Sequence, residues 1–210
     1  MSRHAEAALH ADEDKLREFR PGWNAVARRF ASCAGFEEAF VGSIQTHGDS
    51  PTPIYRHAQE EALFGFFVAG LSTLESLGYA LWFVAAALKP HRFPAATNED
   101  LRKICLSVLK DKMLADFGAD PLARALDALC SSSEFQSWKD IRNTLAHRSS
   151  PSRTIFMSNA GPAQAAVWNT PGGPITLDAA MARSRRAWLA ASTGAAMLEM
   201  DRFMVRRFNV

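Results

Sequence analysis

The feature that most constrains the fold is a long apolar stretch, Ala62 to Leu88, in which Glu75 is the one charged residue. A run of this length suffices to cross a bilayer as a helix. A carboxylate near its middle is costly in lipid, however, and the residues just before the stretch include acids but no clear basic flank. We therefore interpret it as the central helix of a protein core and expect no membrane association. Because a buried carboxylate needs a partner, Glu75 should meet a donor or a cation.

The remaining residues indicate further helices around this central one. Proline-rich and glycine-rich breaks, N-capping residues and apolar periodicity set their expected limits. The central helix should begin at Pro53, after a loop over 46–52, and should end at Lys89-Pro90. The other helices are expected at 2–19, closed by Pro21-Gly22; 23–32 or on to 44; 98–117 with Asn98 as N-cap; from Asp120-Pro121 to about 130; 134–148; and from a cap at Thr176 or Asp178 to 208.

Between the last two helices the character of the chain changes. Two short β-like runs, 154–157 and 165–168, flank a turn signal at 158–162 and indicate a hairpin. The expected fold class is all-α: an up-down helical bundle with an N-terminal helical arm and a small β-hairpin insertion at about 153–170. The arm, residues 1–50, should pack on the bundle, residues 51–210, in one compact domain.

Composition excludes several classes of protein. Hydrophobic residues make up 48% of the chain and charged residues 22%, as in ordinary globular proteins. The three cysteines are too few and too far apart for a disulfide framework, and the six histidines show no metal-ligand spacing with each other or with the cysteines. We expect no metal and no cofactor. The charged N-terminal residues lack the apolar core of a signal peptide, so a cytoplasmic location is expected.

Basic residues concentrate toward the end of the chain. From Lys139 onward ten Lys and Arg side chains stand against four Asp and Glu, whereas the whole chain carries a net charge of +2. Such an excess is compatible with a polyanionic partner, although arginines of this kind are more often the solvated face of a helix.

One short segment combines several chemically useful groups. Arg142, Asn143 and His147 provide a permanent cation, an amide and a side chain that titrates near neutral pH. These are the groups needed to hold a phosphate and to move a proton beside it. Phosphate-binding loops, nucleophile elbows and zinc-binding His-Glu-x-x-His helices are absent from the sequence.

The segment resembles the signature of the HEPN superfamily, in which an arginine, often followed by a polar residue, precedes a histidine by four to six residues. Here Arg142-Asn143 precedes His147 with four residues between the arginine and the histidine, in a helical frame with an acid on an upstream apolar helix. The resemblance implies a bundle of about four helices that dimerises so that two motif helices face each other. In many members this is a metal-independent endoribonuclease, which implies RNA as a partner, and possible partners also include an antitoxin or a nucleotidyltransferase.

The resemblance also implies roles for single residues. His147 would act as general base or acid at the 2′-hydroxyl or the leaving 5′-oxygen, Arg142 would steady the scissile phosphate, and Asn143 would orient the histidine or the phosphate. Glu75, Lys139 and Arg148 are supporting candidates. The expected products are a 2′,3′-cyclic phosphate and a 5′-hydroxyl, because RNA carries its own nucleophile.

Helical geometry separates the three motif residues. Asn143 and His147 share one face, whereas Arg142 lies about 140° from His147, at the edge of the buried face, where Glu75 is a candidate partner. Two motif helices from two chains bring an arginine and a histidine together more simply than one, so we expect a homodimeric site.

Other interpretations of the motif are open. His147 and Arg148 also suit the negative end of a helix dipole, and an Arg142–Glu75 pair is compatible with a purely structural role. The alternative functions are a non-catalytic HEPN-like module that binds a nucleotide or a protein, and a structural helical interaction domain. The hairpin insertion lies outside the minimal family pattern, so it either shapes or blocks the cleft.

Overall fold

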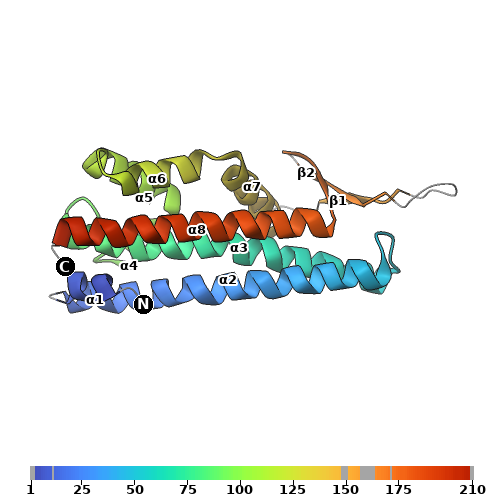
Figure 1. The fold of residues 1–210 in the computed structure, drawn as a ribbon, viewed down its shortest axis with the longest axis horizontal. Coiled ribbons are helices and arrows are strands. Elements are labelled where there is room, and N and C mark those ends of the chain that lie inside the picture. Colours follow the sequence, from blue (N-terminus) through green and yellow to red (C-terminus); the bar gives the residue numbers. More distant parts are fainter. Residues whose placement is uncertain (1–2, 11, 148–150, 157–163, 171, 209–210) are drawn as a thin grey trace. The chain divides into compact units, whose positions relative to one another are not determined.

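The computed structural model describes residues 3–10, 12–147, 151–156, 164–170 and 172–208. They form a mostly helical chain with a small sheet before the last helix, as the fold class predicted (Figure 1). In chain order the elements are α1 (Arg3–Leu9), α2 (Glu13–His47), α3 (Pro53–Leu88), α4 (Asn98–Lys103), α5 (Leu106–Phe117), α6 (Pro121–Ser131), α7 (Ser133–His147), β1 (Ser152–Thr154), β2 (Val167–Thr170), β3 (Gly173–Thr176) and α8 (Ala179–Phe208).

The chain divides into two compact units. Unit 1 comprises Met1–Arg28, Ser72–Ser132 and Ala191–Val210, and unit 2 comprises Arg29–Leu71 and Ser133–Ala190. Each of the long helices α2, α3 and α8 is divided between the two units. The motif helix α7 and the sheet belong wholly to unit 2, so the candidate site can be described within that unit alone.

The N-terminal helices differ from their expected limits. The break falls between Leu9, where α1 ends, and Glu13, where α2 begins; Asp12 accepts a hydrogen bond from the backbone N–H of Lys15 and so caps the start of α2. Helix α2 then continues through Pro21, which was predicted to end a helix. Packing explains the continuity: Gly22 lies so close to Tyr79 of α3 that an added Cβ would come within 2.9 Å of its ring. Tertiary contact here outweighs the local break signal.

Helix α3 begins at Pro53, as predicted, and is the central core helix. Among the described residues it is the one helix long and apolar enough to cross a membrane, and 72% of its most apolar window is buried inside the protein. Phe66, Phe67 and Leu74 are fully buried on it. This burial fits a core helix.

The helix predicted over 98–117 is two helices, α4 and α5, so its predicted continuity was wrong. Thr97, and not Asn98, caps α4, in a capping box with Asp100. The break at Ile104–Cys105 has a cause from elsewhere in unit 1: the Glu75 carboxylate accepts a hydrogen bond of 2.8 Å from the backbone N–H of Leu106, the first residue of α5. The carboxylate on the apolar helix thus caps another helix.

The insertion is a three-stranded antiparallel sheet of order β1-β2-β3, with one strand more than the predicted hairpin. The additional strand, β3, begins at Gly173, whose φ of 111° suits glycine. Part of the predicted hairpin, residues 157–163, lies outside the described residues.

The sheet is held on α3 by buried polar contacts within unit 2. Arg153 of β1 donates to the Gln59 amide oxygen at 2.7 Å and pairs with Glu60 at 3.2 Å, and the Trp168 indole N–H of β2 donates to the other Glu60 oxygen at 2.9 Å. Only 5% of the Arg153 side chain is exposed. A buried, hydrogen-bonded pair of this kind fixes where the sheet attaches to the helix.

Helices α6 and α8 begin at capping residues that the sequence predicted. Asp120 caps α6, whose first residue is Pro121, by accepting from the backbone N–H of Leu122. Of the two candidate caps for the last helix, Asp178 performs the function, with a hydrogen bond of 2.6 Å from the backbone N–H of Met181, while Thr176 ends β3.

Candidate functional site

Helix α7 presents an apolar stripe to the core. Phe135, Trp138 and Ile141 are buried, and Leu145, one turn further, is half-buried. Residues spaced at three and four positions lie on one face of a helix, so this stripe fixes which sides of α7 remain outside the core.

Trp138 is the residue that seats α7 in unit 2. Its ring lies 5.0 Å from those of both Phe66 and Phe67 on α3, and it fills a notch at Gly70. A Cβ built on Gly70 would stand 2.3 Å from the Trp138 ring, far inside van der Waals contact. The glycine is therefore required for the close approach of the two helices, which was not predicted at this residue.

The motif residues Arg142 and Asn143 lie on the second half of α7 and are both half-buried. Among the residues that the structure describes, no carboxylate lies within ion-pair distance of Arg142. Lys139, one turn earlier, is also half-buried. The guanidinium of Arg142 thus keeps its charge uncompensated by a protein acid in the described chain, at the edge of the buried face where the helical wheel placed it.

The structure describes only some of the remaining predicted site residues. His147 is the last residue of α7, but its side chain lies outside the described residues, as does the whole of Arg148. Glu75 belongs to unit 1, where it caps α5, and its predicted pairing with Arg142 of unit 2 stays a prediction. Arg142 and Asn143 are consecutive in the sequence and both half-buried, and the approach of His147 to them remains a prediction.

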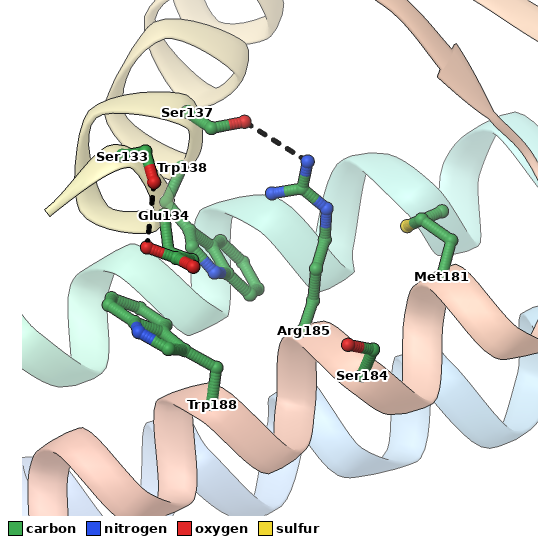
Figure 2. Close-up of a pocket in the computed structure, with 8 residues that line it drawn as sticks. All are labelled: Ser133, Glu134, Ser137, Trp138, Met181, Ser184, Arg185 and Trp188. Atoms are coloured by element: carbon green, nitrogen blue, oxygen red, sulfur yellow. Dashed lines mark hydrogen bonds between the residues drawn. The ribbon is translucent and has the colours of Figure 1, made fainter.

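A pocket of about 490 Å³ lies between the first half of α7 and the first half of α8, within unit 2. Figure 2 shows its side chains converging from the two helices. Its lining combines two indoles, three hydroxyls, two charged groups and one thioether: Ser133, Glu134, Ser137, Trp138, Met181, Ser184, Arg185 and Trp188. Pockets of this size hold small organic ligands, and convergent polar groups among aromatic walls are typical of such sites.

Arg185 is the central charged group of the pocket. Its Nη2 donates to the Ser137 hydroxyl at 3.0 Å, and its guanidinium carbon lies 5.3 Å from the centre of the Phe67 ring. Both partners are neutral, and within the described chain no acid lies within ion-pair distance of it. Burial lowers the pKa of the Arg185 guanidinium, while the nearby Glu134 carboxylate opposes this effect.

Trp138 adds an unused donor to the same pocket. Its side chain is 1% exposed, and its indole Nε1 has no hydrogen-bond partner among the described residues. Figure 2 places this nitrogen on the side of the ring nearest Glu134 and Trp188. Since buried N–H groups are nearly always paired, this covered nitrogen is a donor for which the described residues supply no acceptor.

This pocket was not found from the sequence, although one signal for it exists. Met181, Trp188 and Leu189 define the apolar stripe of the last helix, and Arg185 falls four residues after the first and three before the second, inside that stripe. An arginine at a core-facing position is unusual and indicates a specific partner or a site. The sequence alone suggested only that Arg185 belongs to the basic residues of the C-terminal third.

Neither a family model, nor a curated protein, nor a solved structure matches this chain. The resemblance to the HEPN superfamily therefore depends on the motif residues of α7 and on the helical frame around them.

Proposed function

We propose that the protein is a metal-independent endoribonuclease of HEPN type that cleaves RNA at a site shared by two copies of α7, as a cytoplasmic toxin or defence enzyme. The observation that carries the proposal is the half-buried position of the consecutive residues Arg142 and Asn143 on α7, with no ion pair to the arginine among the described residues. An arginine already bound to an acid has little capacity for phosphate, whereas this one retains its charge for a ligand.

The chemistry follows from the residue types. RNA supplies its own nucleophile, the 2′-hydroxyl, so cleavage requires removal of that proton, protonation of the leaving 5′-oxygen and stabilisation of the charge that develops on the phosphate. His147 is proposed to transfer the proton, and Arg142 to hold the phosphate in a bidentate contact. Asn143, with one donor group and one acceptor group, is proposed to orient either of them. Lys139 adds positive charge one turn away.

The dimeric site follows from helical geometry. Arg142 and His147 diverge by about 140° around the axis of an α-helix, so one helix presents them to different neighbours. A two-fold axis between two copies of α7 brings the arginine of one chain beside the histidine of the other, and the same contact occurs twice.

A second candidate function is a non-catalytic module of the same type that binds a nucleotide or a protein. It needs only Arg142 and Asn143, the two motif side chains that the structure describes, and no proton transfer by His147. Binding by a guanidinium and an amide requires a positioned phosphate or carboxylate alone.

One assay separates the two functions. The purified full chain is incubated with single-stranded RNA in EDTA, beside Arg142→Ala, His147→Ala and the control Arg183→Ala, which changes an exposed arginine of α8. We expect cleavage by the wild type and the control, and a loss of about a hundredfold or more in both motif variants, the usual range for a general acid or base. Cyclic phosphate ends on the products identify the reaction.

Equal residual cleavage in all four proteins contradicts the proposal, because it indicates a contaminating nuclease. RNA or nucleotide binding that weakens in Arg142→Ala, with no cleavage by the wild type, selects the binding module instead. Circular dichroism spectra that match the wild type exclude unfolding as the cause of either result.

A further inference from the structure

We propose that the pocket between α7 and α8 is a binding site for a small aromatic carboxylate, distinct from the Arg142-Asn143 motif and independent of the proposed ribonuclease activity. Five groups carry the inference: the Arg185 guanidinium, the two indoles of Trp138 and Trp188, the Ser137 hydroxyl and the Glu134 carboxylate at the mouth. All of them belong to unit 2.

The charge of Arg185 indicates an anionic ligand. A partly buried guanidinium loses hydration, and neither the Ser137 hydroxyl nor the Phe67 ring returns the free energy that a carboxylate supplies. By contrast, the adjacent Arg186 pairs with the buried Glu37. Ser137 takes one terminal nitrogen of Arg185, and Figure 2 shows the other terminal nitrogen on the side where Trp138 lies, toward the pocket. Donors therefore remain for a ligand.

The other lining residues select the kind of anion. Glu134 lies near enough to Arg185 to affect its pKa, so the pocket carries one positive and one negative group. Glu134 repels a dianionic phosphate more strongly than a carboxylate, which brings a single charge in a planar fork that matches a guanidinium.

The indoles specify an aromatic body. Trp188 is half-buried on α8 and faces the pocket in Figure 2, opposite the fully buried Trp138 of α7. Aromatic pairs in offset or edge-to-face contact are more favourable than their buried area alone accounts for, and they order a flat ligand between the helices. A volume of about 490 Å³ accommodates one or two fused rings.

The test uses a pair of probes of the same shape but different charge. Binding of naphthoate and of its neutral counterpart naphthamide to the full chain is measured by isothermal titration calorimetry. We expect naphthoate to bind at least tenfold more tightly than naphthamide, and Arg185→Gln to remove this preference. The control Arg183→Gln, an exposed arginine of the same helix, should bind naphthoate as the wild type does. Bound naphthoate should also raise Tm.

A second variant keeps the test valid if Arg185→Gln alters the fold. Trp188→Leu removes an aromatic wall but leaves the cation, so it should weaken naphthoate several-fold while leaving an aliphatic carboxylate such as cyclohexanecarboxylate unaffected. Equal binding of naphthoate and naphthamide, absence of binding at millimolar concentration, or tighter binding of inorganic phosphate or a nucleotide than of naphthoate would each overturn the proposal. None of these results bears on RNA cleavage by the motif.

Discussion

Arginines at the two ends of α8 are held in contrasting ways. In unit 1, Arg206 and Arg207 near the end of the helix both contact Asp120, at 2.7 and 3.4 Å, and this buried carboxylate also caps α6. In unit 2, Arg185 near the start of the helix has a hydroxyl and an aromatic ring in place of an acid. Arginines of the first kind stabilise the fold, while one of the second kind keeps its charge for a ligand.

Arg142 belongs with Arg185 in this comparison. Each lies half-buried in unit 2, and the described residues place no carboxylate within ion-pair distance of either. Neither Arg142 nor Arg185 forms an ion pair within the described residues, and this distinguishes them from Arg206 and Arg207; we propose that they are the positions where this protein receives anions.

The largest expected effect concerns the paired arginines. Asp120→Ala removes the contacts to Arg206 and Arg207 and the N-cap of α6, so we expect a loss of about 3 kcal/mol in the free energy of unfolding, measured by urea denaturation. Asp111→Ala, at an exposed acid, is the matched control and should change stability by less than about 0.5 kcal/mol. Similar stability of the two variants would remove the structural role assigned to Asp120.

A smaller effect is expected where Trp138 meets Gly70. Gly70→Ala places a methyl group on the Trp138 ring and should destabilise the protein by about 2 kcal/mol through overpacking. Gly194→Ala, on α8, meets no atom within 4 Å and should instead stabilise by about 0.5 kcal/mol, since alanine favours helices. If both substitutions stabilised the protein, Trp138 would not be seated at Gly70, and the pocket that it lines would have another shape.

The smallest expected effect is the most informative for the comparison. Arg185→Gln removes a charge that forms no close ion pair within the described residues and feels Glu134 only at longer range, so the free energy of unfolding should change by no more than about 0.5 kcal/mol. Arg186→Gln, one residue further, leaves the buried Glu37 carboxylate without its cation and should cost clearly more. A large loss for Arg185→Gln, equal to that for Arg186→Gln, would show that Arg185 stabilises the fold after all.

Local signals predicted much of the fold because they act over a few residues. Pro53 and Asp120-Pro121 marked the starts of α3 and α6, and helical geometry placed Arg142 at the edge of the buried face of α7. Signals that depend on distant residues failed. The break between α4 and α5 involves Glu75, 31 residues before Leu106, and α2 passes Pro21 where Gly22 packs on Tyr79.

The candidate site shows the same limit. Arg142 and Asn143 were found because a short motif contains them, and their half-buried position agrees with the helical wheel. The pocket was missed because Arg185 and Ser137 are 48 positions apart, and only tertiary packing joins them. A third strand was missed for a related reason: Gly173 and Pro174 are turn residues by local preference, but they pair with β2.

The most direct test of the central claim, that α7 supplies half of a site completed by a second copy, is a mixing experiment. Arg142→Ala and His147→Ala chains carrying different tags are each inactive by expectation, and they are mixed, allowed to exchange subunits and assayed for RNA cleavage in EDTA. A shared site predicts recovery of about a quarter of wild-type activity, because half of the dimers are mixed and each mixed dimer holds one intact site of two. Absence of recovery, when tag capture confirms that mixed dimers have formed, would contradict the shared site.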